Sequence, residues 1–386
     1  MQESFTRRKF LTHGASAALA TGVLSLTRVR ISECAQAGDG PPAGSSDIQV
    51  KEFRRSGMLY RRLGLTDLFV SVLGFGAHTD PHYKIPLKWG NKLTEEGQLR
   101  RDRLISEALD RGVNMFDVYQ PERQYEPMAR MTKGRREKVL VSLKYQRGSG
   151  LDLAKAIEQS ADLFGGYIDL YRLNRPERDE RYLENWDILR KAKQAGKVRA
   201  IGIVSHTPAF MTLALGELEG LDFIVFPYNF IHAKADYSEF LPAAIKKGLG
   251  LIVIKPLAAG SIMKLDPRAR PGSSPEYEGI EVVKPGKASI LSGVVAELTK
   301  SLNRLPDETL CQAAMRFVYS RSFVSCTIPS MFQEQELDDN YKSLQRRLEL
   351  GRSESEGLEG VRKVAFMLQG GWLKRGYKWL EDEWRA

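Results

Sequence analysis

Residues 139–144 read Val-Leu-Val-Ser-Leu-Lys, residues 168–173 read Ile-Asp-Leu-Tyr-Arg-Leu, and residues 198–203 read Val-Arg-Ala-Ile-Gly-Ile. Each of these short apolar segments is typical of a buried strand. Residues 153–164 and 183–195, which lie between them, place apolar side chains at helical spacing. Because strand and helix patterns alternate, we expect parallel strands joined by crossover helices.

The same alternation continues outward in both directions. Upstream, residues 59–63 and 68–70 flank a turn that begins at Gly64, which predicts an N-terminal hairpin. About eight strands in all favour an α/β fold in which they close into a (β/α)8 TIM barrel. An open doubly wound sheet is the alternative, but it needs a G-x-G-x-x-G loop that the sequence lacks. The other predicted strands are residues 70–75, 113–116, 223–226, 251–254 and 325–328, and the other predicted helices are residues 99–111 and 310–319.

Composition excludes several classes of protein. The chain has 386 residues, of which 42% are hydrophobic and 27% charged, the balance of an ordinary globular protein. The net charge is +10, but basic and acidic residues are interspersed, so we expect no nucleic-acid partner. The cysteines form no C-x-x-C pair, so no metal site is predicted. Cys311 and Cys326 form either a disulfide or two buried free thiols.

The N-terminus has the order of an export signal. Thr6-Arg-Arg-Lys-Phe-Leu11 precedes an apolar run at residues 15–26, and Ala35-Gln-Ala37 supplies small residues before a cleavage site. The run is too short for stable membrane insertion. The paired arginines resemble the twin-arginine export signal. We therefore expect the export machinery as a partner and a periplasmic location.

These signals divide the chain into four parts. Residues 1–37 are the predicted signal peptide, and residues 38–56 are a polar linker. Residues 57–348 are the barrel, and residues 349–386 are a C-terminal helical extension. Three tryptophans in this extension have near-helical spacing, so we expect them to pack against the barrel.

Polar residues end several predicted strands, where the reactive groups of such a barrel lie. Asp117 and Lys144 end neighbouring strands, so the carboxylate can orient the ammonium. The ammonium in turn can lower the pKa of a nearby phenol, which can then give a proton to a carbonyl oxygen. The alternative is a salt bridge with only a structural role. The other polar residues at strand ends are Asn174, Ser205, Tyr228 and Lys255.

Several stretches resemble the aldo/keto reductases, in the same order, over roughly residues 59–344. They are Tyr60-Arg-Arg-Leu-Gly64, Gly112-Val-Asn-Met-Phe-Asp117, residues 134–139, 168–171 and 196–202, and Lys255-Pro256-Leu257. The resemblance implies a (β/α)8 barrel that reduces aldehydes and ketones with NADPH.

The resemblance also assigns catalytic residues. The family uses Asp, Tyr, Lys and His, and Asp117 and Lys144 match two of them. Tyr119 matches the Tyr if three residues are deleted before it, and Tyr125 is the alternative. Asn174 occupies the His position, as in the potassium-channel β subunits. Asn can hydrogen-bond a carbonyl but cannot relay a proton near neutral pH.

For the cofactor, the resemblance implies NADP, with NAD as the alternative. Tyr228 matches the aromatic residue that stacks on nicotinamide, and Ser205 lies near the amide-binding position. Lys255, Pro256, Leu257, Ser330 and Asn340 match further cofactor-binding positions. Glu336 stands where many members place an Arg for the 2′-phosphate, which weakens the preference for NADP.

The sequence therefore predicts an oxidoreductase that reduces a small-molecule aldehyde or ketone with a nicotinamide cofactor. The alternative is a cofactor-binding protein with little or no turnover, which Asn174 and the short spacing from Asp117 to Tyr119 favour.

Overall fold

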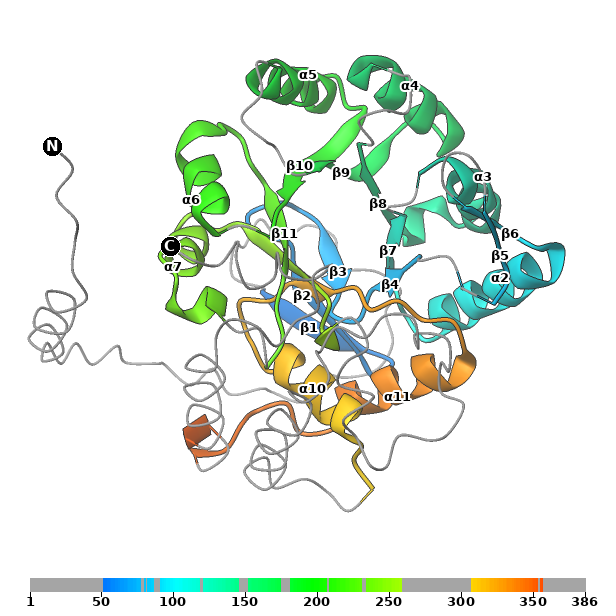
Figure 1. Cartoon of the computed structure of the whole chain (residues 1–386), viewed down its shortest axis with the longest axis vertical. Helices are drawn as coiled ribbons and strands as arrows, with labels where there is room; N and C mark the ends of the chain where they lie inside the picture. The colour runs from blue at the N-terminus through cyan, green and yellow to red at the C-terminus, as the bar shows by residue number, and fades with distance from the viewer. Residues whose placement is uncertain are drawn as a thin grey trace, which may run out of the picture. The chain divides into compact units, whose positions relative to one another are not determined.

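Eight parallel strands, separated along the chain by helices, form the central sheet (Figure 1). The computed structural model describes residues 51–77, 80, 82–86, 91–118, 121–145, 152–174, 181–206, 208–230, 234–258, 307–352 and 355–356. In sheet order the strands are β4 (Phe75–Gly76), β7 (Met115–Val118), β8 (Leu140–Lys144), β9 (Ile168–Asn174), β10 (Val198–Val204), β11 (Phe223–Pro227), β12 (Gly250–Ile254) and β13 (Cys326–Thr327).

The first and last strands meet, so the sheet closes. Parallel bridges join Leu73 to Thr327 and Gly76 to Ser330. The Gly74 N–H donates to the Thr327 carbonyl at 2.8 Å, and the Gly76 N–H donates to the Pro329 carbonyl at 2.9 Å. The predicted closed barrel is confirmed, and the open doubly wound sheet is wrong.

Helices surround the barrel (Figure 1). Several begin at a side chain that accepts a backbone N–H of the first turn, as Thr94, Asp152 and Thr309 do. The helices are α2 (Glu95–Asp110), α3 (Pro121–Thr132), α4 (Leu153–Leu163), α5 (Tyr182–Gln194), α6 (Pro208–Glu217), α7 (Phe240–Lys246), α10 (Leu310–Tyr319) and α11 (Glu334–Gln345), with 3-10 turns at η1 (Arg136–Lys138) and η2 (Lys234–Tyr237). No helix among the described residues is long and apolar enough to cross a membrane.

Side chains alternate between the two faces of the barrel wall, which produces two apolar clusters. The inner cluster contains Met115, Leu140, Leu170, Phe223, Ile252 and Cys326. The outer cluster, between strands and helices, contains Phe116, Val141, Tyr171, Ile224 and Val253. Cys311 and Cys326 are not joined in a disulfide, so the disulfide alternative is wrong.

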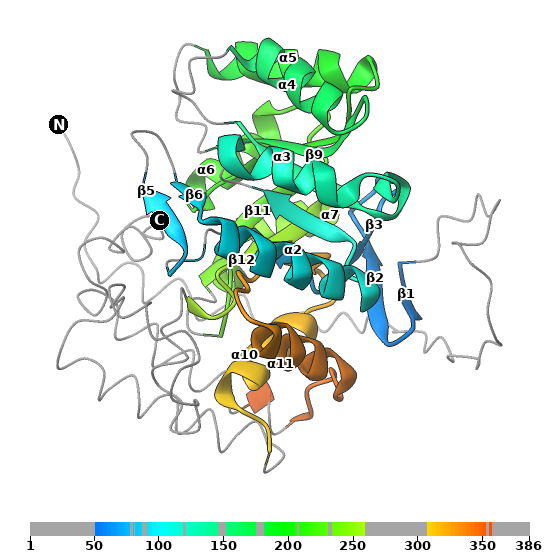
Figure 2. The same cartoon turned by 90° about the vertical axis from the view of Figure 1, so that its right-hand side faces the viewer.

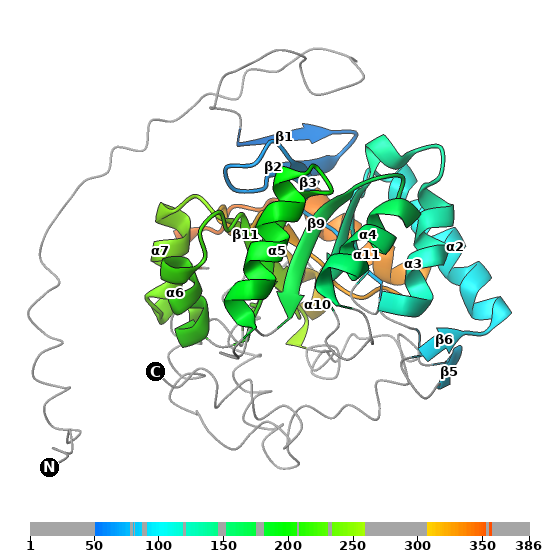
Figure 3. The same cartoon turned by 90° about the horizontal axis from the view of Figure 1, so that it is seen from above.

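A three-stranded antiparallel sheet covers one end of the barrel (Figure 3). It consists of β1 (Glu52–Arg55), β2 (Met58–Arg62) and β3 (Phe69–Ser71). Leu63, Leu68 and Val70 belong to the inner cluster and fill this end. The predicted hairpin is confirmed, and Gly64 turns it with φ +58°, where an added Cβ would lie 2.4 Å from the Gly250 nitrogen.

Two sequence-based boundaries change. The single strand predicted at residues 70–75 is two strands, because Ser71 pairs with Tyr60 in the small sheet while Phe75 pairs with Phe116 in the barrel. Residues 52–55, predicted as linker, form β1.

A second hairpin, β5 (Lys84–Pro86) with β6 (Asn91–Leu93), follows β4 (Figure 2). The signal peptide, the rest of the linker and the tryptophans of the C-terminal extension lie outside the described residues.

Candidate active site

The polar groups of the barrel interior lie just above its apolar layer. Met115, Leu140 and Leu170 belong to the inner cluster. Because side chains alternate along a strand, the residues two positions later also face inward. These residues are Asp117 on β7, Ser142 on β8 and Arg172 on β9, and all three are buried.

Arg172 holds the Asp117 carboxylate with both terminal nitrogens. Its Nη1 lies 2.6 Å from Oδ1 and its Nη2 lies 3.0 Å from Oδ2. The Ser142 hydroxyl donates to the same Oδ1 at 2.8 Å, and Arg172 Nη1 lies 2.6 Å from Ser142 Oγ. Both charged side chains are only 2% exposed. A two-pronged, charge-assisted pair of this kind fixes the position of the carboxylate.

Lys144 ends β8 and is the register partner of Arg172 on β9. The pKa of Lys144 is lowered to about 8, mainly because burial disfavours the charged amine. The positive charge of Arg172 lowers this pKa further, and Asp117 opposes the shift. The ammonium is therefore less stable here than on the protein surface.

The tyrosine of the predicted site has two candidates. Tyr119 lies outside the described residues. Tyr125 lies on α3, and its ring packs edge-on against Phe164 with centroids 6.1 Å apart. Burial raises the pKa of Tyr125 well above its usual value. A proton donor at neutral pH needs the opposite shift, so the environment of Tyr125 does not favour that role.

The ends of β9, β10 and β12 bring three other predicted residues to the same end of the barrel. Asn174 is the last residue of β9 and pairs in register with Val204. Ser205 follows β10 and is buried. Lys255 follows β12 with φ +56°, a strained backbone for a residue with a side chain. The Asn229 side chain holds this turn by donating to the Lys255 carbonyl at 2.9 Å; Pro256 and Leu257 come next in the chain.

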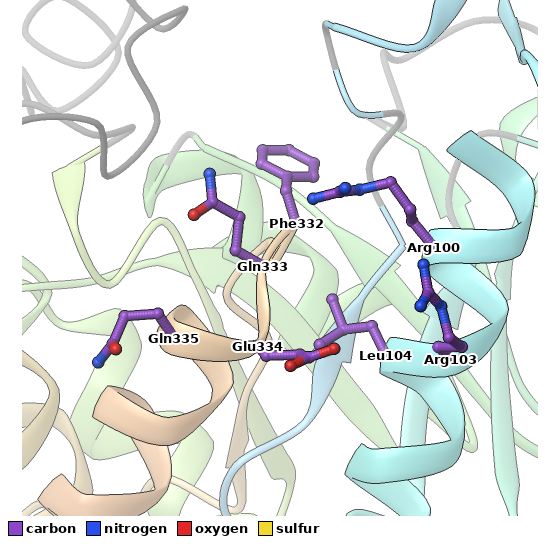
Figure 4. A pocket seen from close by; sticks show the side chains of 7 residues that line it. All are labelled: Arg100, Arg103, Leu104, Phe332, Gln333, Glu334 and Gln335. Atoms are coloured by element: carbon purple, nitrogen blue, oxygen red, sulfur yellow. The ribbon is translucent and has the colours of Figure 1, made fainter. Parts of the chain in front are cut away.

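The segment after β13 lines a cavity of about 320 Å³. Phe332, Gln333 and Glu334 line one side, and Arg100 and Arg103 extend from α2 on the other (Figure 4). Ser330 precedes this segment and bridges to Gly76. Asn340 is buried on α11, where its backbone carbonyl accepts a hydrogen bond from the Tyr319 hydroxyl at 3.2 Å.

The Glu336 carboxylate accepts hydrogen bonds at the start of its own helix, α11. Its Oε2 accepts the backbone N–H of Phe332 at 2.6 Å and that of Gln333 at 3.3 Å. Burial raises the pKa of Glu336 to about 7, although these two hydrogen bonds act in the opposite direction. Glu336 therefore caps α11, and it is absent from the residues that line the cavity.

Comparison with known proteins decides the family. The sequence pattern of the aldo/keto reductase family matches residues 85–354. The chain belongs to the aldo/keto reductase family. A probable voltage-gated potassium channel subunit beta from Arabidopsis thaliana is 26% identical over 317 residues, which cover 74% of this chain and 91% of that protein.

Solved structures show the same fold. The aldo-keto reductase AKR11C1 from Bacillus halodurans matches in its apo form with a TM-score of 0.59 and in its holo form with 0.60. Each match is 22% identical and covers 78% of this chain and 95% of that one. Membership of the aldo/keto reductase family supports an oxidoreductase function, and the comparisons do not favour the binding-protein alternative.

One predicted cofactor residue of this aldo/keto reductase, Tyr228, packs among other aromatic side chains. Tyr228 directly follows β11 and is fully buried, and it belongs to the outer cluster. Its ring stacks on Phe317 with centroids 5.6 Å apart and meets Phe323 edge-on at the same distance. Its hydroxyl lies 2.9 Å from Asp236 Oδ1. Neighbouring aromatic side chains contact this ring, so Tyr228 contributes to packing, and its stacking on nicotinamide stays a prediction.

Arg172 and Ser142 are site residues that the sequence did not predict. Arg172 is the charged one. Its signal was its position two residues before Asn174 on an otherwise apolar strand, which places its side chain inside the barrel. Among the described residues, no group of three His, Cys, Asp or Glu side chains is arranged to hold a metal ion.

Proposed function

We propose that this aldo/keto reductase reduces an aldehyde or ketone, with Lys144, Asp117 and Tyr119 as its catalytic residues. The observation that carries the proposal is the buried cluster of Asp117, Ser142 and Arg172 beside Lys144, at the strand ends where a barrel enzyme places its chemistry. The family match supports the reaction class.

In this proposal one residue donates the proton, and two others stabilise the charge that the donor is left with. Tyr119 gives a proton to the carbonyl oxygen as negative charge develops there. The Lys144 ammonium stabilises the phenolate that remains, and Asp117, fixed by Arg172, stabilises the ammonium. A bound nicotinamide dinucleotide supplies the hydride. Asn174 donates a hydrogen bond to the carbonyl oxygen but no proton, so turnover is slower than an imidazole at this position would allow.

The donor set of the cavity fits the phosphorylated end of a dinucleotide, and NADP is the cofactor we propose. Arg100 and Arg103 contribute two positive charges to this cavity, and Glu334 contributes one negative charge. Glu336 stands where many family members place an Arg for the 2′-phosphate, but its carboxylate accepts the backbone N–H of Phe332 instead. The strained turn at Lys255 and the buried Ser205 are the other cofactor contacts we propose.

The cofactor proposal is tested by binding. Arg100→Gln combined with Arg103→Gln should weaken the binding of NADPH at least tenfold. The affinity for NADH should stay within about twofold of the wild type, as measured by fluorescence titration. Arg130→Gln, on the neighbouring helix α3 and 59% exposed, is the matched control. Equal losses for both nucleotides, or none, would exclude a 2′-phosphate contact.

The reaction itself is tested by following NADPH oxidation at 340 nm with a panel of aldehydes and ketones. We expect saturable turnover with at least one carbonyl compound. Tight nucleotide binding without turnover on any member of the panel would instead support a cofactor-binding protein.

We also propose that the twin-arginine signal exports the folded protein to the periplasm. The support is the sequence at residues 6–11 and the apolar run that follows it. Fractionation of cells should recover the protein in the periplasm. The Arg7→Lys, Arg8→Lys variant should remain in the cytoplasm, and an unchanged distribution would contradict this route.

A further inference from the structure

Arg172 is an additional charged group beside Lys144 in the barrel interior. Two nitrogens of its guanidinium donate to the Asp117 carboxylate, and one of them also contacts the Ser142 hydroxyl. Its Nε is buried and has no hydrogen-bond partner in the part of the chain that the structure describes. A buried guanidinium is costly to maintain unless its charge is paired, so the Asp117 carboxylate is tied to Arg172.

The register places Arg172 next to Lys144. The two residues are Cα partners on adjacent parallel strands, and both follow an inward-facing residue by an even number of positions. Neighbouring strands lie about 4.8 Å apart, so two cations share one layer of the interior. Among the described residues of this cluster, the Asp117 carboxylate acts on both cations, and Arg172 adds a positive charge beside Lys144.

Four titratable groups among the described residues act on Lys144 or on its neighbours in this cluster. Asp117 faces the cluster from β7 and Arg172 faces it from β9. Tyr125 approaches from α3, and Cys326 lies near Asp117 from β13. Burial raises the pKa of the Tyr125 phenol and of the Cys326 thiol well above their usual values, so both are neutral at physiological pH. Among these groups, Asp117 and Arg172 alone carry charge.

We propose that Arg172 is a positioning residue that holds the Asp117 carboxylate and, by its charge beside Lys144, sets the pH above which the reduction stops. This inference rests on the proposed function, because it assigns Lys144 the charge that tunes the phenol. As pH rises, Lys144 loses its proton, the phenolate loses its stabilising charge, and kcat/KM for reduction falls. Burial and Arg172 both lower the pKa of Lys144, to about 8, so the fall begins within the physiological range.

The pH profile of kcat/KM tests the role of Arg172. The wild type should lose activity with an apparent pKa near 8. Arg172→Met removes the like charge and releases Asp117 to Lys144, so the alkaline limb should move up by at least one pH unit. Arg172→Lys keeps a charge beside Lys144, so its limb should stay within about half a unit of the wild type.

A matched control separates this effect from loss of a buried ion pair. Arg136 lies 2.7 Å from the buried carboxylate of Asp169, and it is not one of the groups that shift the pKa of Lys144. Arg136→Met should lower stability and leave the alkaline limb in place. Arg172→Gln serves where Arg172→Met does not fold, because glutamine is neutral and can still donate to Asp117. A folded neutral variant at position 172 with an unmoved limb would overturn the proposal.

A second readout does not depend on turnover. Trace acetylation with isotopic acetic anhydride, mapped by mass spectrometry, gives the titration midpoint of each lysine. We expect Lys144 in the wild type to titrate near 8, and in the neutral variants at least one unit higher, with Lys155 on the surface unchanged. A wild-type midpoint above 9.5 would overturn the proposal. A protein without turnover but with these midpoints would refute the proposed function and leave the role of Arg172 intact.

Discussion

At the residue scale, the site depends on side chains that end neighbouring strands. Lys144 should be essential, because its ammonium tunes the phenol that gives the proton. Lys144→Met should lower kcat/KM for carbonyl reduction at least 100-fold while circular dichroism and the unfolding midpoint stay close to those of the wild type. Lys155→Met, whose side chain is 73% exposed, should leave the rate unchanged. A Lys144→Met rate within about twofold of the wild type, or ~0.5 kcal/mol of barrier, would remove Lys144 from the mechanism.

Replacing Asn174 should raise the rate of reduction instead of lowering it. Asn174→His should raise the rate of reduction several-fold, because a neutral imidazole can both donate to the carbonyl oxygen and exchange a proton. Stopped-flow measurement of the first turnover isolates this step from product release. Asn174→Gln keeps the amide and is the control. A rate no higher than that of the wild type, with nucleotide binding intact, would argue that Asn174 does not face the substrate.

Sequence alone could identify some site residues and not others. Asp117 and Lys144 follow apolar segments whose strands are unambiguous, so their place at the barrel mouth is predictable. The pairing of Asp117 with Arg172 depends on the relative register of β7, β8 and β9, which no local pattern encodes. Tyr228 has a strand-end position like the others, but the contacts with Phe317 and Phe323 from distant sequence decide its environment.

At the element scale, the stability of the start of α11 should depend on pH. Glu336 caps this helix, and burial raises its pKa from 4.5 to about 7. The folded state therefore binds the proton more tightly than the unfolded state does between these two pH values. Stability that is present below about pH 4.5 is lost as pH rises through 7.

Glu336→Gln should remove this dependence. Each unit of pKa shift is about 1.4 kcal/mol, and the group is partly exposed, so we expect the wild type to lose about 2 kcal/mol more than the variant between pH 5 and pH 7.5. Urea unfolding at both pH values measures the difference. Glu184→Gln, an exposed substitution in the first turn of α5, should behave like the wild type. Parallel losses in the wild type and Glu336→Gln would contradict the assignment.

Element boundaries were predictable where periodicity is strong and not where chain direction changes. The helices and strands between residues 139 and 204 match their patterns closely. The stretch of residues 69–76 is apolar throughout, and only pairing with Tyr60 on one side and Phe116 on the other divides it into β3 and β4. Residues 52–55 are largely charged, so their pairing with β2 has no apolar signal.

At the scale of the whole molecule, the barrel and the proposed export signal together make a prediction. Free nicotinamide nucleotides should be scarce outside the cytoplasm, so a cofactor has to be loaded before export of the folded chain. Binding at a hundredfold excess over Kd adds ~2.7 kcal/mol to the stability of the native state. We expect the mature protein to retain its nucleotide through purification and to cycle it between an alcohol and a carbonyl compound.

Denaturing the protein isolated from the periplasm and analysing the supernatant by mass spectrometry checks this prediction. About one nucleotide per chain should be released. Finding none, together with no binding in titration, would overturn the idea of a cofactor-loaded cargo.

The central claim, that this barrel reduces carbonyl compounds by hydride transfer, is tested most directly by following the hydride. The purified protein, first freed of any bound nucleotide, is incubated with the aldehyde panel and with NADPH that carries deuterium at both hydrogen positions of nicotinamide C4. The alcohols are then analysed by mass spectrometry. We predict one deuterium in the product alcohol, and its loss in Lys144→Met. No deuterium in any alcohol, from a protein shown by titration to bind the nucleotide, would contradict the account.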